Sequence, residues 1–122
     1  MAISEQKWKA YRETAKRREE EERRRLKFRF HKAWKLARSA GKLLVKNFGA
    51  RKVFVFGSLL SEELFHLKSD IDLAVLGLNE KHYYRAQGQL LALDPEFEID
   101  LVFIEDAPES LKEKIDSEGI EI

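Results

Sequence analysis

The chain has 122 residues, with 23 Lys and Arg, 22 Asp and Glu, and no cysteine. That length allows one domain, since domains typically hold about 50–200 residues. The lack of cysteine excludes a disulfide framework and a cysteine-based zinc site, and no apolar run reaches the ~20 residues that a membrane span needs. We therefore expect a cytoplasmic protein without a membrane partner.

The net charge of +1 hides a division along the chain. Residues 1–50 hold 16 Lys and Arg and 6 Asp and Glu, whereas residues 51–122 hold 7 and 16. Such a division indicates that the two parts meet different partners. Clustered Lys and Arg can bind nucleic acid through its phosphates. Here glutamates are interleaved and no base-reading motif is visible, so we expect a solvated helix face or a protein-binding arm, and no nucleic-acid partner.

The first part of the chain has the pattern of a helix. From Ser4 to Asn47 there is no proline and one glycine, and Ser4 is a suitable N-cap. Asn47 and Gly49 are C-terminal signals. In between, three Glu-to-Arg pairs at i,i+4 each add about 0.2–0.5 kcal/mol of helix stability, namely Glu19–Arg23, Glu20–Arg24 and Glu21–Arg25. We expect helices over 4–25 and 27–47, separate or continuous, with Trp34 and Leu44 buried.

Residues 1–25 form a charged helical arm in this interpretation, and residues 26–122 form the domain. Trp8 and Tyr11 are the large apolar side chains of the arm. They pack back on the domain, or they are exposed and dock a partner or a second copy of the chain. The sequence leaves both alternatives open.

Three apolar runs then predict strands, and two amphipathic segments predict helices. Gly, Asn and Pro separate these segments, and Pro108 suits the first turn of the last helix. A helix start at Ser61-Glu62-Glu63-Leu64 makes the loop 59–69 part helical. The fold class expected is α+β, a small mixed sheet packed against helices, with strands at 52–56, 71–76, 97–104 and 120–122 and helices at 80–92 and after Pro108.

Acidic residues concentrate where the second and third strands are expected. Asp70 and Asp72 are separated by one residue, so on a strand they share a face. Asp100 is the acidic residue deepest in the third apolar run, where an isolated carboxylate would be unfavourable. Oxygen ligands suit Mg²⁺, which commonly lies between carboxylates and substrate phosphates. The preceding Gly57-Ser58 pair can supply backbone N–H groups for an anion.

The pattern Gly57-Ser58, Asp70-Ile71-Asp72 and Asp100 resembles the nucleotidyltransferases related to DNA polymerase β, and among them the minimal nucleotidyltransferase domains. The likeness covers Leu36 to Ile122. One difference is Ser61-Glu62-Glu63, where many relatives carry Arg-Gly.

The resemblance implies a nucleotidyltransferase fold and transfer of a nucleoside monophosphate, AMP from ATP, to a hydroxyl. Asp70, Asp72 and Asp100 would be catalytic and hold two Mg²⁺ ions, with Mn²⁺ as a substitute. Gly57 and Ser58 would hold the triphosphate. Lys68 is either a further triphosphate contact or an exposed loop residue.

The resemblance also implies a partner, because such domains commonly occur with a helical HEPN toxin and serve as its antitoxin by adenylylating a tyrosine. Two alternatives are a non-catalytic module that neutralises its partner by contact and an aminoglycoside-type nucleotidyltransferase. Self-association through the arm would give a homo-oligomer.

Overall fold

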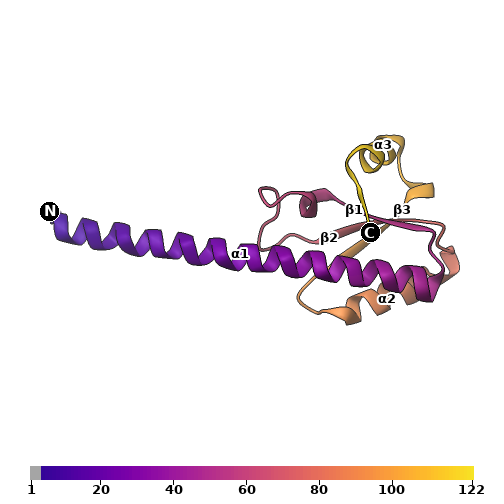
Figure 1. The fold of residues 1–122 in the computed structure, drawn as a ribbon, viewed down its shortest axis with the longest axis horizontal. Helices are drawn as coiled ribbons and strands as arrows, with labels where there is room; N and C mark the ends of the chain where they lie inside the picture. Colours follow the sequence, from indigo (N-terminus) through magenta and orange to yellow (C-terminus); the bar gives the residue numbers. More distant parts are fainter. Residues whose placement is uncertain (1–3) are drawn as a thin grey trace.

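The structure is a computed structural model that describes residues 4–122. Residues 1–3 of the arm lie outside the described residues. Figure 1 shows a long helix with a small sheet beside its C-terminal half and the shorter helices α2 and α3 on either side of that sheet. In chain order the elements are α1 (Glu5–Phe48), β1 (Lys52–Phe56), the 3₁₀ turn η1 (Gly57–Leu60), β2 (Ile71–Leu76), η2 (Glu80–His82), α2 (Tyr83–Leu93), β3 (Ile99–Phe103), η3 (Ile104–Asp106), α3 (Glu109–Glu118) and β4 (Ile120–Glu121).

Helix α1 is continuous over 44 residues, so the two expected helical portions are joined. Ser4 caps its start by accepting a hydrogen bond from the Lys7 N–H. Gly49 ends it in the left-handed conformation (φ 70°) and donates its N–H to helix carbonyls, which satisfies groups that a helix end leaves free. At ~1.5 Å per residue the helix is about 66 Å long.

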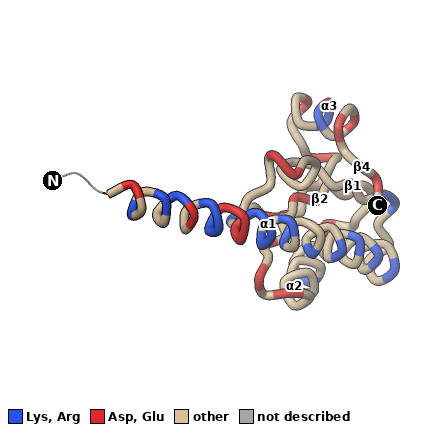
Figure 2. The backbone as a smooth tube through the Cα atoms, turned by 60° about the vertical axis from the view of Figure 1, so that its left-hand side comes forward, with Lys and Arg blue, Asp and Glu red and all other residues tan. Residues whose placement is uncertain are grey.

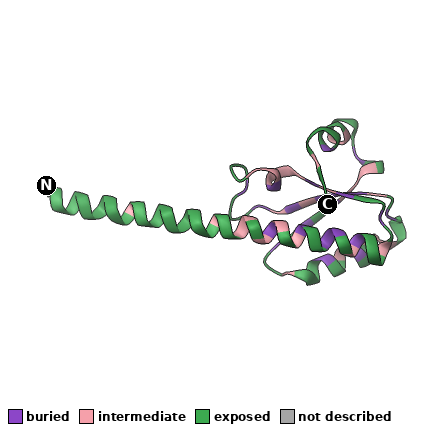
Figure 3. Cartoon of the chain, in the orientation of Figure 1, coloured by how far each residue is buried: buried purple, intermediate pink, exposed green. Residues whose placement is uncertain are grey.

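Only the C-terminal half of α1 contacts the sheet. Its buried residues are small, except for Leu44, and lie at helical spacing: Ala33, Ala37, Ala40, Gly41 and Leu44. Figure 3 shows the N-terminal half exposed along its length. Trp8 is 47% exposed and Tyr11 is 67% exposed. Their rings pack edge to face, with the ring centroids 6.1 Å apart. In this structure the arm therefore extends away from the domain and does not fold back on it.

The four strands form one mixed sheet in the order β3-β2-β1-β4. β1 is antiparallel to β2 and β4, whereas β2 and β3 are parallel. The crossover between the parallel strands contains α2, as parallel pairing requires. This arrangement confirms the α+β class.

The sheet has two different faces. Alternate residues of β1, β2 and β3 are buried on the face that α1 and α2 cover: Val53, Val55, Ile71, Leu73, Val75, Ile99 and Leu101. The opposite face carries Phe54, Asp72 and Asp100. Figure 1 shows α3 on this second side. A hollow there is lined by Phe54 and α3 residues, so α3 covers only part of that face.

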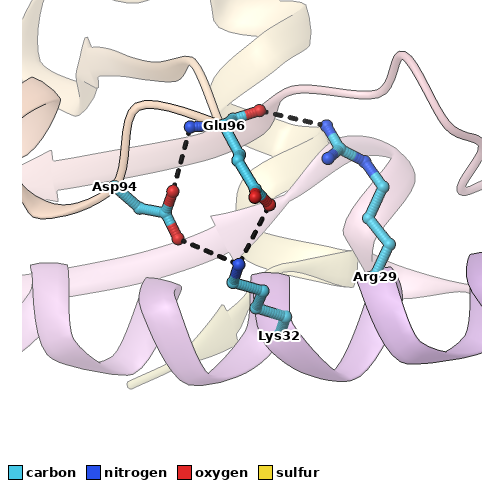
Figure 4. Close-up of polar contacts among 4 residues, drawn as sticks. All are labelled: Arg29, Lys32, Asp94 and Glu96. Atoms are coloured by element: carbon cyan, nitrogen blue, oxygen red, sulfur yellow. Dashed lines mark hydrogen bonds and ion pairs between the residues drawn. The ribbon is translucent and has the colours of Figure 1, made fainter.

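A polar clamp fixes the segment between α2 and β3 to α1 (Figure 4). Lys32 Nζ lies 2.9 Å from Glu96 and 3.5 Å from Asp94. The Arg29 guanidinium stacks over the Phe97 ring at 4.1 Å and donates to the Glu96 carbonyl. The exposed ion pairs contribute little by themselves, whereas buried Phe97 anchors the segment in the core. The clamp holds the segment that precedes β3 against α1.

Two expected elements differ from the structure. The helix start at Ser61 is wrong: Ser61–Leu64 forms one isolated turn, because the chain must return to bury Phe65 in the core. The helical turn lies earlier, at Gly57–Leu60. The third strand is shorter than 97–104, because β2 starts at Ile71, opposite Ile99, and offers no partner before that point. No helix within residues 4–122 is long and apolar enough to cross a membrane.

Trp34 fastens η1 to α1. Its indole Nε1 donates to the Leu59 carbonyl at 2.9 Å, and Leu59 itself is fully buried. The η1 turn is therefore held in two ways, through the hydrogen bond to the Leu59 carbonyl and through the buried Leu59 side chain.

We expect Trp34→Phe to lower the free energy of unfolding by about 1–2 kcal/mol, because one buried hydrogen bond and part of the ring packing are lost. Urea denaturation followed by circular dichroism measures this. Trp8→Phe is the matched control, since Trp8 is exposed, and it should leave the midpoint unchanged. Equal effects of the two substitutions would contradict the anchoring role of Trp34.

Candidate active site

Asp72 and Asp100 stand side by side on the partly open face of the sheet. They are directly paired in the register of the parallel strands β2 and β3, and neighbouring strands lie about 4.8 Å apart. Phe56 is the partner of Asp72 on the other side. Because paired positions share a face, both carboxylates project in the same direction. Asp70 precedes β2 by one residue and is half-buried.

The charge of Asp72 is disfavoured by its surroundings. Partial burial, then the negative charges of Asp100 and Asp70, raise the pKa of the Asp72 carboxyl to about 6. Asp72 is thus close enough to both Asp100 and Asp70 for their charges to affect it. Asp100 is exposed, contrary to the expectation of a deeply placed carboxylate, because β3 is an edge strand and α3 leaves this end of the face open.

Gly57 gives the Asp72 carboxylate its space. The backbone of Gly57 has φ +77°, and an added Cβ would lie 2.5 Å from Asp72 Oδ2. A side chain at position 57 would therefore be strained and would displace the carboxylate. The Asp72 carboxylate thus occupies the space that a side chain at position 57 would need.

Ser69 fixes the loop immediately before Asp70. It is buried, and its Oγ accepts from the His66 N–H while its own N–H donates to the His66 carbonyl, both at 2.9 Å. The next fixed point is the Ile71 N–H, which donates to the Glu98 carbonyl at 2.9 Å. Asp70 is thus held between two anchored residues.

The other expected binding residues are divided between two hollows. Gly57 and Ser58 line a hollow of about 670 Å³ together with Leu60, Leu64, Lys114 and Glu118. Lys68 lines a different hollow, of about 620 Å³, between its loop and α1, with His66, Leu67, Leu26, Glu19, Glu22 and Arg23. Both hollows are of the size typical of small-molecule sites.

The donor chemistry suits a hard divalent cation. Asp70, Asp72 and Asp100 offer oxygen ligands. The raised pKa of Asp72 reflects partial burial first and then repulsion by Asp100 and Asp70, and a cation would relieve that repulsion. Within residues 4–122, no three His, Asp or Glu side chains are already arranged as a metal site. The residues therefore fit Mg²⁺ by type and neighbourhood, without a preformed coordination shell.

Sequence reasoning missed three residues that shape this region: Trp34, Ser69 and Lys114. Trp34 and Lys114 reach the Gly57–Leu60 turn only through the packing of α1 and α3, which no local pattern reveals. Ser69 lies next to Asp70, but the sequence does not reveal that its side chain is buried, and this burial is what marks it as important.

The raised pKa of Asp72 predicts how stability depends on pH. Its folded-state pKa exceeds the ordinary 3.8, which means that the folded state favours the protonated, neutral carboxyl. This contribution to stability is complete below about pH 4 and is lost as the pH rises through about 6. In EDTA, Asp72→Asn should therefore raise the free energy of unfolding by on the order of 1–2 kcal/mol at pH 7.5 and leave it unchanged at pH 4, given partial screening.

Thermal melts at several pH values measure this effect. Asp116→Asn, an exposed change on α3, is the control and should be neutral at every pH. A gain for Asp72→Asn that is equal at pH 4 and 7.5 would contradict the clustered carboxylates.

Several solved structures that resemble this chain are toxin–antitoxin complexes. One complex, with AMP-PNP, matches at 27% identity and a TM-score of 0.55, and covers 66% of each chain. The MntA-HpeT complex with a tyrosine-to-alanine mutation matches at 26% and 0.52, over 66% of this chain and 65% of the other. The same complex with two aspartates, separated by one residue, changed to glutamate matches at 25% and 0.54, over 66% of each chain. The chain thus spans just under two thirds of these solved chains.

No curated protein sequence matches the chain. The family model described as "Polymerase beta, Nucleotidyltransferase" matches residues 39–122, which include η1, all four strands and the three acidic residues. Together with the fold and the geometry of the Gly57 turn, this match shows that the chain belongs to the polymerase β-type nucleotidyltransferase family.

Proposed function

We propose that this protein transfers AMP from ATP to a hydroxyl group, and that the acceptor is a tyrosine of a HEPN toxin, for which the chain serves as the antitoxin. The observation that carries the proposal is the Asp72–Asp100 pair next to the Gly57 turn. Family membership and the likeness to toxin–antitoxin complexes, one with AMP-PNP, support it. The proposal includes a cytoplasmic location, where ATP is available.

The positions of the residues support the roles that we propose for them. The Gly57 and Ser58 N–H groups, with the Ser58 hydroxyl, bind the phosphates at the wall of their hollow. Asp70, Asp72 and Asp100 would hold two divalent cations, Mg²⁺ or Mn²⁺, which when bound supply charge neutralisation on the leaving pyrophosphate and a lower pKa of the acceptor hydroxyl. Asp72 must be ionised for this role, so the raised pKa predicts weaker cation binding below about pH 6.

The arm is our candidate for the contact with the acceptor protein. The domain itself is small, and residues 5–14 and 16–25 of α1 are exposed. Trp8, Tyr11, Ala15 and Leu26 recur at helical spacing on the side of α1 that farther along packs against the sheet. Aromatic residues of this kind favour interfaces, since each joins a large apolar body to a polar tip. The toxin, or a second copy of the chain, would cover this stripe.

The charge of α1 suits such a contact. Between Leu26 and Phe48 the helix carries seven Lys and Arg and no acidic residue, and Figure 2 shows this uninterrupted basic stretch after the mixed charges of the arm. An acidic partner surface would be steered toward α1, and steering of this kind weakens with salt.

A transfer assay tests the reaction. Purified protein, ATP labelled at the α-phosphate, Mg²⁺ and the product of a neighbouring toxin gene should give a labelled toxin, with the label on tyrosine. Asp72→Asn should reduce turnover by at least 100-fold, and Ser58→Ala by less, because the backbone N–H groups survive that change.

The outcomes separate the alternatives. A toxin that is bound and inhibited without being labelled would indicate a module acting by contact. Label appearing on an aminoglycoside and not on the toxin would indicate the small-molecule alternative. If Ser58→Ala were the more damaging substitution, the assignment of the Gly57–Ser58 turn would be wrong.

Deleting residues 1–25 tests the arm. We expect the truncated chain to fold and to bind ATP, because residues 4–14 and 16–25 are exposed and only Ala15 is half-buried. Its binding to the toxin, or its self-association, should fall at least tenfold at low salt. Light scattering and a pull-down compare the two proteins at 50 and 500 mM salt, and the double substitution Trp8→Ala/Tyr11→Ala distinguishes the aromatic stripe from the charges. Unfolding of the truncated chain would mean that the arm belongs to the core.

A further inference from the structure

Helix α3 completes the hollow that begins at the Gly57–Ser58 turn. Its residues Lys114 and Glu118 line the hollow across from the turn, four residues apart and thus on the same side of the helix. Leu60 and Leu64 supply the apolar part of the wall. The volume of about 670 Å³ accommodates a small organic ligand.

The hollow has a single cationic side chain among its lining residues, Lys114. The loop that follows the turn brings Glu62 and Glu63, and both are exposed. Its basic residues, His66 and Lys68, line the separate hollow against α1. The other charges close to the turn are negative, namely Asp72 in the space that a side chain at position 57 would need, its neighbours Asp70 and Asp100, and Glu118.

Lys114 forms no ion pair in the described part of the chain. The ion pairs found within residues 4–122 are those that Lys32 makes with Asp94 and Glu96. Glu118 lies one helical turn away, but its carboxylate is not within 4 Å of the Lys114 ammonium. An exposed ammonium on a flexible stem therefore stands at the rim of an otherwise acidic site.

We propose that Lys114 binds the β- and γ-phosphates of the nucleoside triphosphate, and supplies from α3 the phosphate-binding cation that the loop after Ser58 does not. Divalent cations on the aspartates would offset part of the charge of the triphosphate, and a further positive charge at the Gly57–Ser58 hollow would attract the phosphates that lie there. Lysine binds phosphate well as a compact point charge. The assignment rests on the proposed function, because it names a contact of the same nucleotide.

Neighbouring residues of α3 provide matched controls. Lys112 is on the same helix but lines the hollow under α3, with Lys52 and Phe54, away from the Gly57–Ser58 turn. Lys112→Gln thus removes the same charge from the same helix at a different place. Glu118→Gln removes a negative charge from the proposed site and should have the opposite effect to Lys114→Gln.

The experiment is isothermal titration of the full chain with Mg-ATP, tripolyphosphate and AMP at 50 and 300 mM salt. Lys114→Gln should weaken the binding of ATP and of tripolyphosphate about tenfold, as expected for loss of one charge-assisted contact, and leave AMP binding within about twofold. Lys114→Arg should retain most of the affinity. Lys112→Gln should match the wild type, Glu118→Gln should bind ATP a few-fold more tightly, and the difference made by Lys114 should shrink at high salt.

Each result decides the assignment. If the wild type binds ATP and Lys114→Gln binds it equally well, Lys114 does not contact the phosphates, and the proposed function stands. If Lys112→Gln and Lys114→Gln weaken binding equally, the effect is one of general charge and the assignment is again wrong. A wild type that binds neither ATP nor tripolyphosphate overturns both proposals. Normal binding effects without any transfer to the toxin would leave Lys114 as a phosphate contact and reject the transfer reaction.

Discussion

The close packing of α1 on the sheet is the interaction on which the rest of this structure depends. Ala33, Ala37 and Ala40 present almost no side-chain bulk, so the helix lies close to β1 and β2, and Leu44 fills the remaining space. At the C-terminal end, Ile122 packs against Gly41, where any added Cβ would collide with it. This packing buries one face of the sheet and sets Trp34 where it can hold the Leu59 carbonyl. The opposite face is thereby left to α3 and to polar residues.

The carboxylates occupy that second face at an energetic disadvantage. An Asp72 side chain beside Asp70 and Asp100, partly shielded from water, destabilises the metal-free fold at neutral pH. Proteins commonly retain such repulsion where a ligand will neutralise it, and the Gly57 turn preserves the space it needs. Lys114 is different, because its positive charge lies near Glu118 and forms no ion pair in the described residues, so it remains available to a ligand.

The strands at 52–56 and 71–76 could be predicted to the residue, because each is a short apolar run followed by a glycine that turns the chain. The same alternation placed Asp72 and Asp100 on one face once the strands were parallel. What failed depended on tertiary context. The Ser61 turn has a good helix-start sequence, yet the burial of Phe65 stops it. The exposure of Asp100 follows from the edge position of β3, and the approach of Lys114 to Ser58 follows from the placement of α3. Neither can be read from neighbouring residues.

The continuity of α1 through the boundary between arm and domain has a mechanical consequence. No glycine or proline interrupts the helix between Glu5 and Ala40, so the arm has no built-in hinge where it leaves the sheet. Trp8 precedes Leu26 by 18 residues, which corresponds to about 27 Å along the axis. A flexible tether would let a bound protein sample many distances from the carboxylates, whereas a stiff rod holds it at one reach and one orientation. Inserting or deleting one residue in the arm would rotate its tip by about 100° relative to the domain. The direction in which the arm presents its side chains therefore depends on the exact number of residues in it.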